Sequence, residues 1–254
     1  MTTVAPRRDR RGVLLAATGI ALLVLAADLV GRTGLAGPAW PTATDLLAFL
    51  GGPTAGPLLL RAIGATGTAA LLGFLLGGLA ALAVAVLGVV LPALHPGLDR
   101  LAAVLHAVPL IALGPLLVTT VGREGTSTVV AAIAAGFAVF VAATSGLATP
   151  GEAQQDVFRV LGASRWTTLL RLRFPAGLPT IVDGLTLAAP AAVLGAVIGE
   201  WFGARRGIGV LLVSAMQNVQ IPLLWTAALS AAGLSLLAYL LLVGLHRYTV
   251  RRFT

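Results

Sequence analysis

The chain has 254 residues, of which 58% are hydrophobic and only 10% are charged, and its net charge is +8. A soluble domain carries about 25% charged residues, so the composition excludes an ordinary water-soluble protein and predicts a membrane protein. Cysteine and lysine are both absent, which excludes a disulfide, a thiol nucleophile and the lysine-containing phosphate loop of ATP-binding proteins.

Six apolar runs are long enough to cross a bilayer, which takes about 20 helical residues. In chain order, the predicted transmembrane helices cover residues 13–30, 58–91, 101–121, 127–148, 181–202 and 223–245. The first is expected to be retained rather than cleaved as a signal peptide, because no convincing small-residue cleavage site precedes the next polar stretch. The remaining predicted segments are the long polar segment 149–179 and the tails 1–12 and 246–254. We therefore expect an all-α, polytopic membrane protein with one domain over residues 1–254.

All 17 basic residues are arginine, and they lie mainly at the ends of the apolar runs. This placement suits lipid headgroups and argues against nucleic-acid binding. With a cytoplasmic N-terminus, twelve arginines lie inside and five outside, which is the imbalance that the positive-inside rule predicts. Both termini and residues 149–179 are thus predicted to be cytoplasmic, and the polar turn at residues 122–125 to lie outside.

Two glycine patterns indicate close helix packing. Glycines occur four residues apart at Gly73 and Gly77, and again at Gly195, Gly199 and Gly203. Small residues at this spacing let the backbones of membrane helices approach each other. For the pair, chance spacing in a chain rich in glycine and alanine is an equally good explanation, whereas the triple favours packing.

The polar segment reads as two short amphipathic helices separated at Gly162. The apolar stripe of the first consists of Val157, Val160 and Leu161, and that of the second of Trp166, Leu169, Leu170 and Phe174. Ser164 is a candidate cap for the second helix. Pro175 and Pro179 are expected to end it before the next span. An apolar stripe on a short cytoplasmic loop predicts contact with the membrane surface or with another protein.

The residues around this glycine resemble the "EAA" coupling loop of ABC importer permeases. The likeness rests on residues 161–166, on Arg171 and on the pair Phe174-Pro175, while residues 156–158 hold the position of the Glu-Ala-Ala triplet. In that family the loop docks into a groove of a separate ATPase. The resemblance therefore implies that these residues couple the chain to an ATPase: Asp156, Val157, Phe158, Leu161, Gly162, Ala163, Ser164, Arg165, Trp166, Arg171 and Pro175.

Three further stretches, residues 40–45, 107–115 and 199–209, are similar to the nitrate/sulfonate/taurine branch of these permeases. The resemblance implies the type I ABC importer permease fold with six transmembrane helices, located in the bacterial plasma membrane. The implied partners are an ATP-binding subunit that carries ATP and Mg²⁺, a second permease subunit (identical or paralogous) and an extracytoplasmic solute-binding protein. The implied solute is a sulfonate, taurine, nitrate or a vitamin precursor.

Other polar residues are weaker candidates. His106, Pro109 and Glu200 are candidate pathway or gate residues, and Arg205 and Arg206 are candidate contacts of the binding protein. Glu200 and the two arginines serve equally well as ordinary interfacial charge, and His106 as a packing histidine. No catalytic cluster or metal site is recognisable, so we do not expect this chain to be an enzyme or to hold its own cofactor.

Two other functions are alternatives to transport driven by ATP. An ion-gradient-driven secondary transporter needs inverted repeats, interrupted spans and acidic residues at the membrane midplane, whereas the acids of this chain lie mostly at helix ends. A membrane-bound enzyme or assembly factor needs a reactive cluster, which is absent from the sequence.

Overall fold

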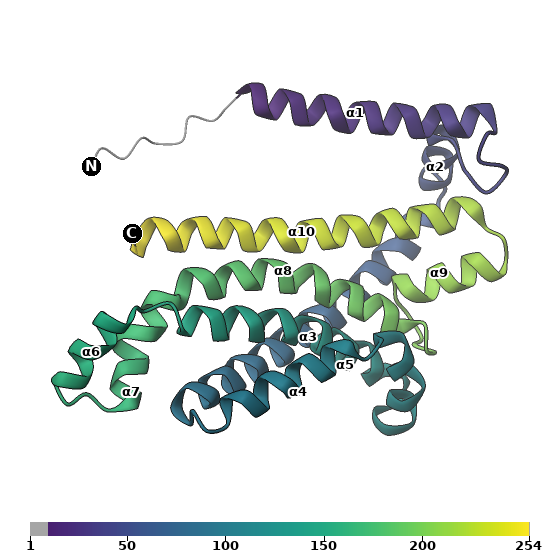
Figure 1. The fold of residues 1–254 in the computed structure, drawn as a ribbon. Coiled ribbons are helices and arrows are strands. Elements are labelled where there is room, and N and C mark those ends of the chain that lie inside the picture. Colours follow the sequence, from purple (N-terminus) through teal and green to yellow (C-terminus); the bar gives the residue numbers. More distant parts are fainter. Residues whose placement is uncertain (1–9, 254) are drawn as a thin grey trace.

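The computed structural model describes residues 10–253, so the predicted tail 1–12 lies mostly outside the described residues. Within this range the chain forms helices and no strands (Figure 1), which confirms the all-α class. The helices are α1 (Arg10–Thr33), α2 (Ala43–Leu50), α3 (Ala55–Val90), α4 (His95–Ala107), α5 (Leu110–Leu147), α6 (Glu152–Val160), α7 (Arg165–Thr168), the π-helical turn η1 (Leu169–Arg173), α8 (Phe174–Glu200), α9 (Ile208–Gln217) and α10 (Ile221–Phe253).

Among the residues that the structure describes, five stretches are long and apolar enough to cross a membrane: Leu14–Thr33, Ala55–Val90, Leu110–Leu147, Arg165–Glu200 and Ile221–Gly244. The helices α5 and α8 form the most extensive pair, with α3 packed on α5 and α10 packed on α8. The helix α1 lies outside this bundle (Figure 1), and none of its apolar window is buried. Trp40, which follows α1, connects this helix to α10. Its indole N–H donates to the carbonyl of Ala27 in α1, and its ring packs edge-on against Trp225 in α10.

Glycines bring the central helices into contact. A Cβ atom on Gly77 of α3 would collide with the backbone of Ala132 in α5, and one on Gly199 of α8 would lie 2.5 Å from Ser127 Cα. The packing predicted from the glycine triple is therefore confirmed at Gly199, and at Gly77, where chance spacing was an equal alternative, the structure shows packing. Gly203 is different, since it lies beyond the end of α8 with a φ of +95°.

The predicted third span, residues 101–121, is not one continuous helix. The chain leaves helical geometry at Val108 and Pro109, which separate α4 from α5. Proline has no N–H to donate and forces the residue before it into an extended conformation. The predicted turn at residues 122–125 is shorter than expected. Only Gly122 departs from helical geometry there, with a φ of +78° and a ψ of +170°, and it forms a kink inside α5.

The prediction that Pro175 and Pro179 end a helix is wrong. The chain is helical without interruption from Arg165 to Glu200. The wide turn η1 explains how it accommodates Pro175, because the N–H of Phe174 donates to the carbonyl of Leu169, five residues back. This shift in the hydrogen-bond register occurs just where the proline lacks a donor.

The two ends of this long helix lie at opposite ends of the bundle. Figure 1 shows α6 and α7 at one end, together with the last turn of α10, and α9 at the other; α1 begins on the side of α6 and α7 and runs toward α9. At about 1.5 Å per residue, the 36 residues from Arg165 to Glu200 span about 54 Å, which exceeds the hydrocarbon thickness of about 30 Å.

Candidate functional site

All eleven residues predicted to contact an ATPase lie in or directly after residues 152–173, which we call the α6–η1 segment. Its bend is a Schellman motif at Gly162, which has a φ of +69°. The N–H of Gly162 donates to the carbonyl of Arg159 at 3.0 Å, and that of Ala163 to the carbonyl of Phe158 at 2.9 Å. The predicted break between two helices is thus confirmed, and its cause is a helix cap that uses backbone groups alone.

Ser164 begins the second helix as predicted. Its hydroxyl oxygen accepts a hydrogen bond from the N–H of Thr167 at 3.1 Å. Such a cap satisfies one of the N–H groups that have no partner in the first turn of a helix. The cap of the 36-residue helix therefore lies two residues after the glycine bend, and the helix begins at the next residue.

The α6–η1 segment presents an apolar surface. Its large exposed apolar side chains are Val157, Val160, Leu161, Trp166 and Leu170, with Val160 at 86% and Leu161 at 77% exposure. Leu169, predicted to share their stripe, is instead buried in the core at 2% exposure. The second predicted stripe is therefore divided between the protein interior and the surface.

One arginine attaches this segment to the bundle, and a second joins two parts of the segment itself. Arg165 donates to the carbonyl of Val90 at the end of α3, at 3.1 Å, and Arg173 donates to Gln155 Oε1 at 2.7 Å. Asp156 forms an exposed ion pair with Arg159 on α6. The other predicted polar contact, Arg171, is exposed. The apolar surface is thus held at a fixed position relative to α3.

At the opposite end of the long helix, Glu200 is buried rather than an interfacial charge, with 2% exposure. Its Oε1 accepts from the hydroxyl of Thr66 at 2.8 Å and its Oε2 from the N–H of Gly209 at 2.7 Å. The hydroxyl of Thr66 in turn accepts from the N–H of Ile208 at 2.8 Å. Two N–H groups in the first turn of α9 are therefore satisfied by side chains of α8 and α3. The positive end of the α9 dipole also faces this carboxyl group.

We call Thr66, Glu200 and residues 207–209 the α3–α8–α9 junction. Its glycines let the backbone pack directly against the carboxyl group of Glu200. Gly207 has a φ of +142°, and a Cβ atom there would collide with the carboxyl group of Glu200. Gly209 is also confined, because its Cβ atom would collide with the carbonyl of Val197. Backbone and carboxyl group therefore approach each other at a distance that only glycine permits.

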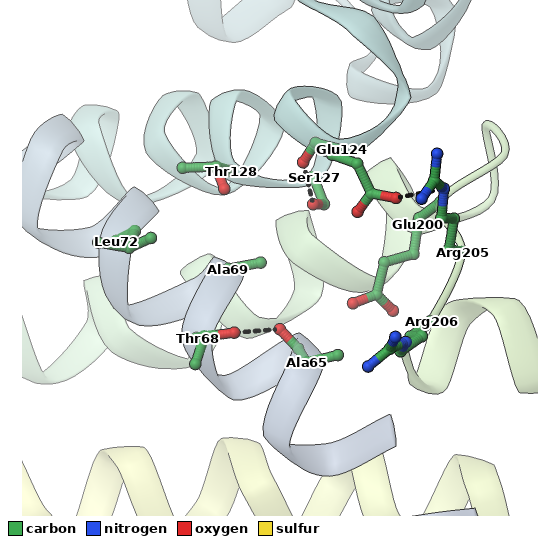
Figure 2. A pocket seen from close by; sticks show the side chains of 11 residues that line it. Ala65, Thr68, Ala69, Leu72, Glu124, Ser127, Thr128, Glu200, Arg205 and Arg206 are labelled. Atoms are coloured by element: carbon green, nitrogen blue, oxygen red, sulfur yellow. Dashed lines mark hydrogen bonds and ion pairs between the residues drawn. The ribbon is translucent and has the colours of Figure 1, made fainter. Parts of the chain in front are cut away.

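A polar cavity of about 400 Å³ adjoins the junction (Figure 2). Its walls come from α3, from α5 and from the chain between α8 and α9. Both predicted binding-protein contacts, Arg205 and Arg206, line it together with Glu124 and Glu200. Arg205 lies 3.5 Å from Glu124, Nε to Oε1, and both side chains are mostly exposed.

The remaining pathway candidates lie elsewhere. His106 and Pro109 line a second, apolar cavity of about 780 Å³ between α3, α4 and α5. The ring of His106 stacks on Phe137 with centroids 3.7 Å apart and an interplanar angle of 6°. The structure therefore brings His106 and Pro109 together but assigns Glu200 to a different cavity. Within residues 10–253 no group of three His, Cys, Asp or Glu side chains is placed to hold a metal ion.

Sequence comparison identifies relatives of this chain. Residues 93–254 match the family described as "Binding-protein-dependent transport system inner membrane component". A probable ABC transporter permease protein of Haemophilus influenzae is 34% identical over 66% of this chain and 68% of the relative. The formylaminopyrimidine transport permease ThiX of Halalkalibacterium halodurans is 35% identical over 41% of this chain and 42% of its own length. The putative aliphatic sulfonates transport permease SsuC of Bacillus subtilis is 30% identical over 59% of this chain and 55% of its own length.

The fold is similar to that of a chain in an inward-facing structure of the MetNI methionine ABC transporter. The TM-score is 0.66 at 19% identity, over 80% of this chain and 99% of the other. At that identity the likeness concerns the fold alone. The match to the family covers more than half of the sequence and agrees with the resemblance seen in its motifs. This chain therefore belongs to the binding-protein-dependent transport system inner membrane components, the permease subunits of ABC importers.

Proposed function

We propose that this permease couples to its ATPase through the exposed apolar surface of the α6–η1 segment. Membership of the family decides in favour of an ABC importer and against an ion-gradient-driven secondary transporter. The ATPase supplies the nucleotide site, with ATP and Mg²⁺, that this lysine-free chain is not expected to contain. The helices that carry this apolar surface are held by the bend at Gly162, the cap at Ser164 and the hydrogen bond from Arg165 to α3. An exposed apolar surface in a fixed position is suited to dock on a protein partner.

The observation that carries the proposal is the continuous helix from Arg165 to Glu200. It begins at the cap beside the exposed surface and ends at the α3–α8–α9 junction. A displacement imposed on α7 by an ATPase therefore reaches the other face of the membrane through one rigid element. Closure of two ATPase subunits would tilt this helix and change access to the pathway.

The same geometry supports an orientation and an assembly. The last turn of α10 and the α6–η1 segment share one end of the bundle, and α1 begins on the same side and runs toward the other end (Figure 1). We assign this end to the cytoplasm, with both termini inside, because of the arginine distribution. The complex would pair this chain with a second permease subunit, identical or paralogous, and receive a small solute from a binding protein at the opposite face.

Leu161→Asp tests the docking surface. Leu161 is 77% exposed, so the substitution leaves the core unchanged while it adds a charge to the apolar surface. With the permease and its ATP-binding subunit co-expressed and purified through a tag on the permease, the variant is expected to lose at least about tenfold of the bound ATPase. Leu35→Asp is the matched control, because Leu35 is 83% exposed but lies between α1 and α2. Equal ATPase recovery with both variants would contradict the proposal.

A further inference from the structure

The polar cavity beside the α3–α8–α9 junction has the size and chemistry of a small-molecule site. Its volume of about 400 Å³ lies in the usual range for ligand cavities, about 300–1,000 Å³. It opens between α3, α5 and the chain that follows α8, at the end of the bundle opposite the α6–η1 segment. Figure 2 shows the carboxyl group of Glu200 and the side chain of Arg206 directed toward this space from one side, and Thr68 on the other.

One of the two arginines that line the cavity, Arg206, is not in an ion pair with any described residue. Both carboxyl oxygens of Glu200 already accept hydrogen bonds inside the junction. Arg205 is paired with Glu124. In the described part of the chain, Arg206 has no acidic group within the 4.0 Å limit of an ion pair. A guanidinium in this position is suited to bind an oxyanion such as a sulfonate, carboxylate or phosphate.

Three hydroxyl groups line the cavity, on Thr68, Ser127 and Thr128. That of Thr128 has no hydrogen-bond partner in the described part of the chain, so it can donate or accept, whereas the other two call for a different part of the ligand. Thr68 donates its hydrogen to the carbonyl of Ala65 at 2.8 Å, and Ser127 donates its hydrogen to the carbonyl of Glu124 at 3.3 Å. With their hydrogens used, these oxygens have only lone pairs to offer to the cavity. They can accept hydrogen bonds from an amino or hydroxyl group but cannot donate to an anion. The carboxylate of Glu124 has the same preference.

The backbone at Arg206 is fixed by the junction, although its side chain is exposed. Residues 201–206 connect Glu200, which is buried, to Gly207, where a Cβ atom would collide with that carboxyl group. Arg206 directly precedes this glycine. The backbone that carries the guanidinium is therefore held in place before a ligand arrives, which lowers the entropic cost of binding.

We propose that this cavity is a solute-binding site, with Arg206 as its anion contact, for small molecules that carry an oxyanion at one end and an N–H or O–H donor at the other. The inference rests on the proposed function, because a transported solute must enter the permease at the face opposite the ATPase. A phospholipid headgroup that combines a phosphate with an ammonium group shares this chemistry, and the experiment separates the two sources.

The test uses the intact permease–ATPase complex in nanodiscs, without binding protein or ATP, and radiolabelled 2-aminoethanesulfonate as the probe. In phosphatidylcholine discs, whose lipid headgroup has no N–H donor, the probe is expected to bind at a single saturable site per permease. Arg206→Gln is expected to weaken binding at least about tenfold, as loss of a hydrogen bond to a charged group does. Arg61→Gln is the matched control, since Arg61 is an exposed arginine of α3 that does not line the cavity.

Two fragments of the probe test the predicted ligand class. Ethanesulfonate lacks the amino group and ethanolamine lacks the sulfonate, so each is expected to bind at least about tenfold more weakly than the complete probe. Discs that also contain phosphatidylethanolamine distinguish the source of the ligand. Unchanged binding there supports a soluble solute, and binding that falls as this lipid is added supports the same cavity chemistry with a headgroup as its occupant.

Three results would overturn the inference: no saturable binding in phosphatidylcholine discs, equal binding by Arg206→Gln and the native chain, or a fragment that binds as tightly as the complete probe. Recovery of the ATPase with each variant is measured in the same samples. An Arg206→Gln complex that retains its ATPase but shows undiminished binding contradicts the binding site alone. If Leu161→Asp does not lower the recovery of the ATPase, the proposed coupling is contradicted instead.

Discussion

The two ends of the helix from Arg165 to Glu200 use glycine for different reasons. At the α6–η1 segment, Gly162 has a φ of +69° and no heavy atom within 4 Å of the place where a Cβ atom would lie. At the α3–α8–α9 junction, Gly207 has a φ of +142° and its Cβ atom would collide with Glu200. The first glycine is required by backbone conformation alone, and the second by conformation and by lack of space.

This difference extends to the polar groups. The α6–η1 segment satisfies its backbone with local caps and leaves apolar side chains exposed, as expected of a surface that a second protein covers. The junction uses a hydroxyl, a carboxyl group and two N–H groups entirely within the chain. Substitutions at the segment should therefore alter association with a partner, and those at the junction should alter the stability of the permease itself.

The largest effect on stability is expected from Gly207→Ala. A positive φ costs an alanine about 1–3 kcal/mol, and overpacking against the carboxyl group adds about 1–3 kcal/mol. We expect the free energy of unfolding of the purified permease in detergent to fall by about 3–5 kcal/mol, measured by denaturant titration. A loss below about 1 kcal/mol would show that the carboxyl group moves aside, and the contrast between the two glycines would then fail.

A smaller loss is expected from Thr66→Val. The valine has a similar shape but leaves the N–H of Ile208 without its acceptor and Glu200 without one of its donors, inside a buried site. An unsatisfied buried polar group costs about 1–3 kcal/mol, so we expect a loss of that size in the same titration.

The matched control for this substitution is Thr226→Val. Thr226 is buried to 3% exposure, and its hydroxyl donates only to carbonyls of its own helix, those of Pro222 and Leu223. Its loss is expected to stay below about 0.5 kcal/mol, because those carbonyls belong to a helix that supplies its own donors. Thr66→Ser, which keeps the hydroxyl, should restore most of the stability. Equal losses for Thr66→Val and Thr226→Val would mean that the junction contributes no more than any buried threonine.

The features that could be predicted from the sequence are those with a local cause. The bend at Gly162 and the cap at Ser164 depend on residues at most five positions apart, so the sequence around them is sufficient. The prediction that fails also rests on local sequence. Proline usually ends a helix, but the wide turn η1, which the sequence does not reveal, lets the helix continue through Pro175 and Pro179. The break at Pro109 fell inside a run whose hydropathy alone indicated one helix.

The junction could not be predicted in this way. The hydrogen bond between Thr66 and Glu200 joins positions 134 residues apart, and that between Ile208 and Thr66 joins positions 142 apart. Neither residue stands in a periodic pattern that links it to the other. The nearby sequence offers only the two glycines Gly207 and Gly209 after the acidic Glu200. They allow a close approach of backbone and carboxyl group, but they do not show that α3 supplies the hydrogen-bond partner Thr66. Glu200 was therefore a candidate by residue type, whereas Thr66 was missed.

Apart from the control Thr226→Val, the smallest loss of stability is expected from Gly162→Ala. Because nothing lies within 4 Å of the added methyl group, only the cost of a left-handed backbone remains, about 1–2 kcal/mol for a residue with a Cβ atom. The two hydrogen bonds of the Schellman motif are formed by backbone groups and survive the substitution. Denaturant titration should therefore show a loss well below that of Gly207→Ala, and Gly162→Asn should reduce it further, since asparagine tolerates this conformation. If Gly162→Ala proved as damaging as Gly207→Ala in the isolated permease, the α6–η1 segment would have to be packed against the bundle, and its apolar side chains would not be free to meet an ATPase.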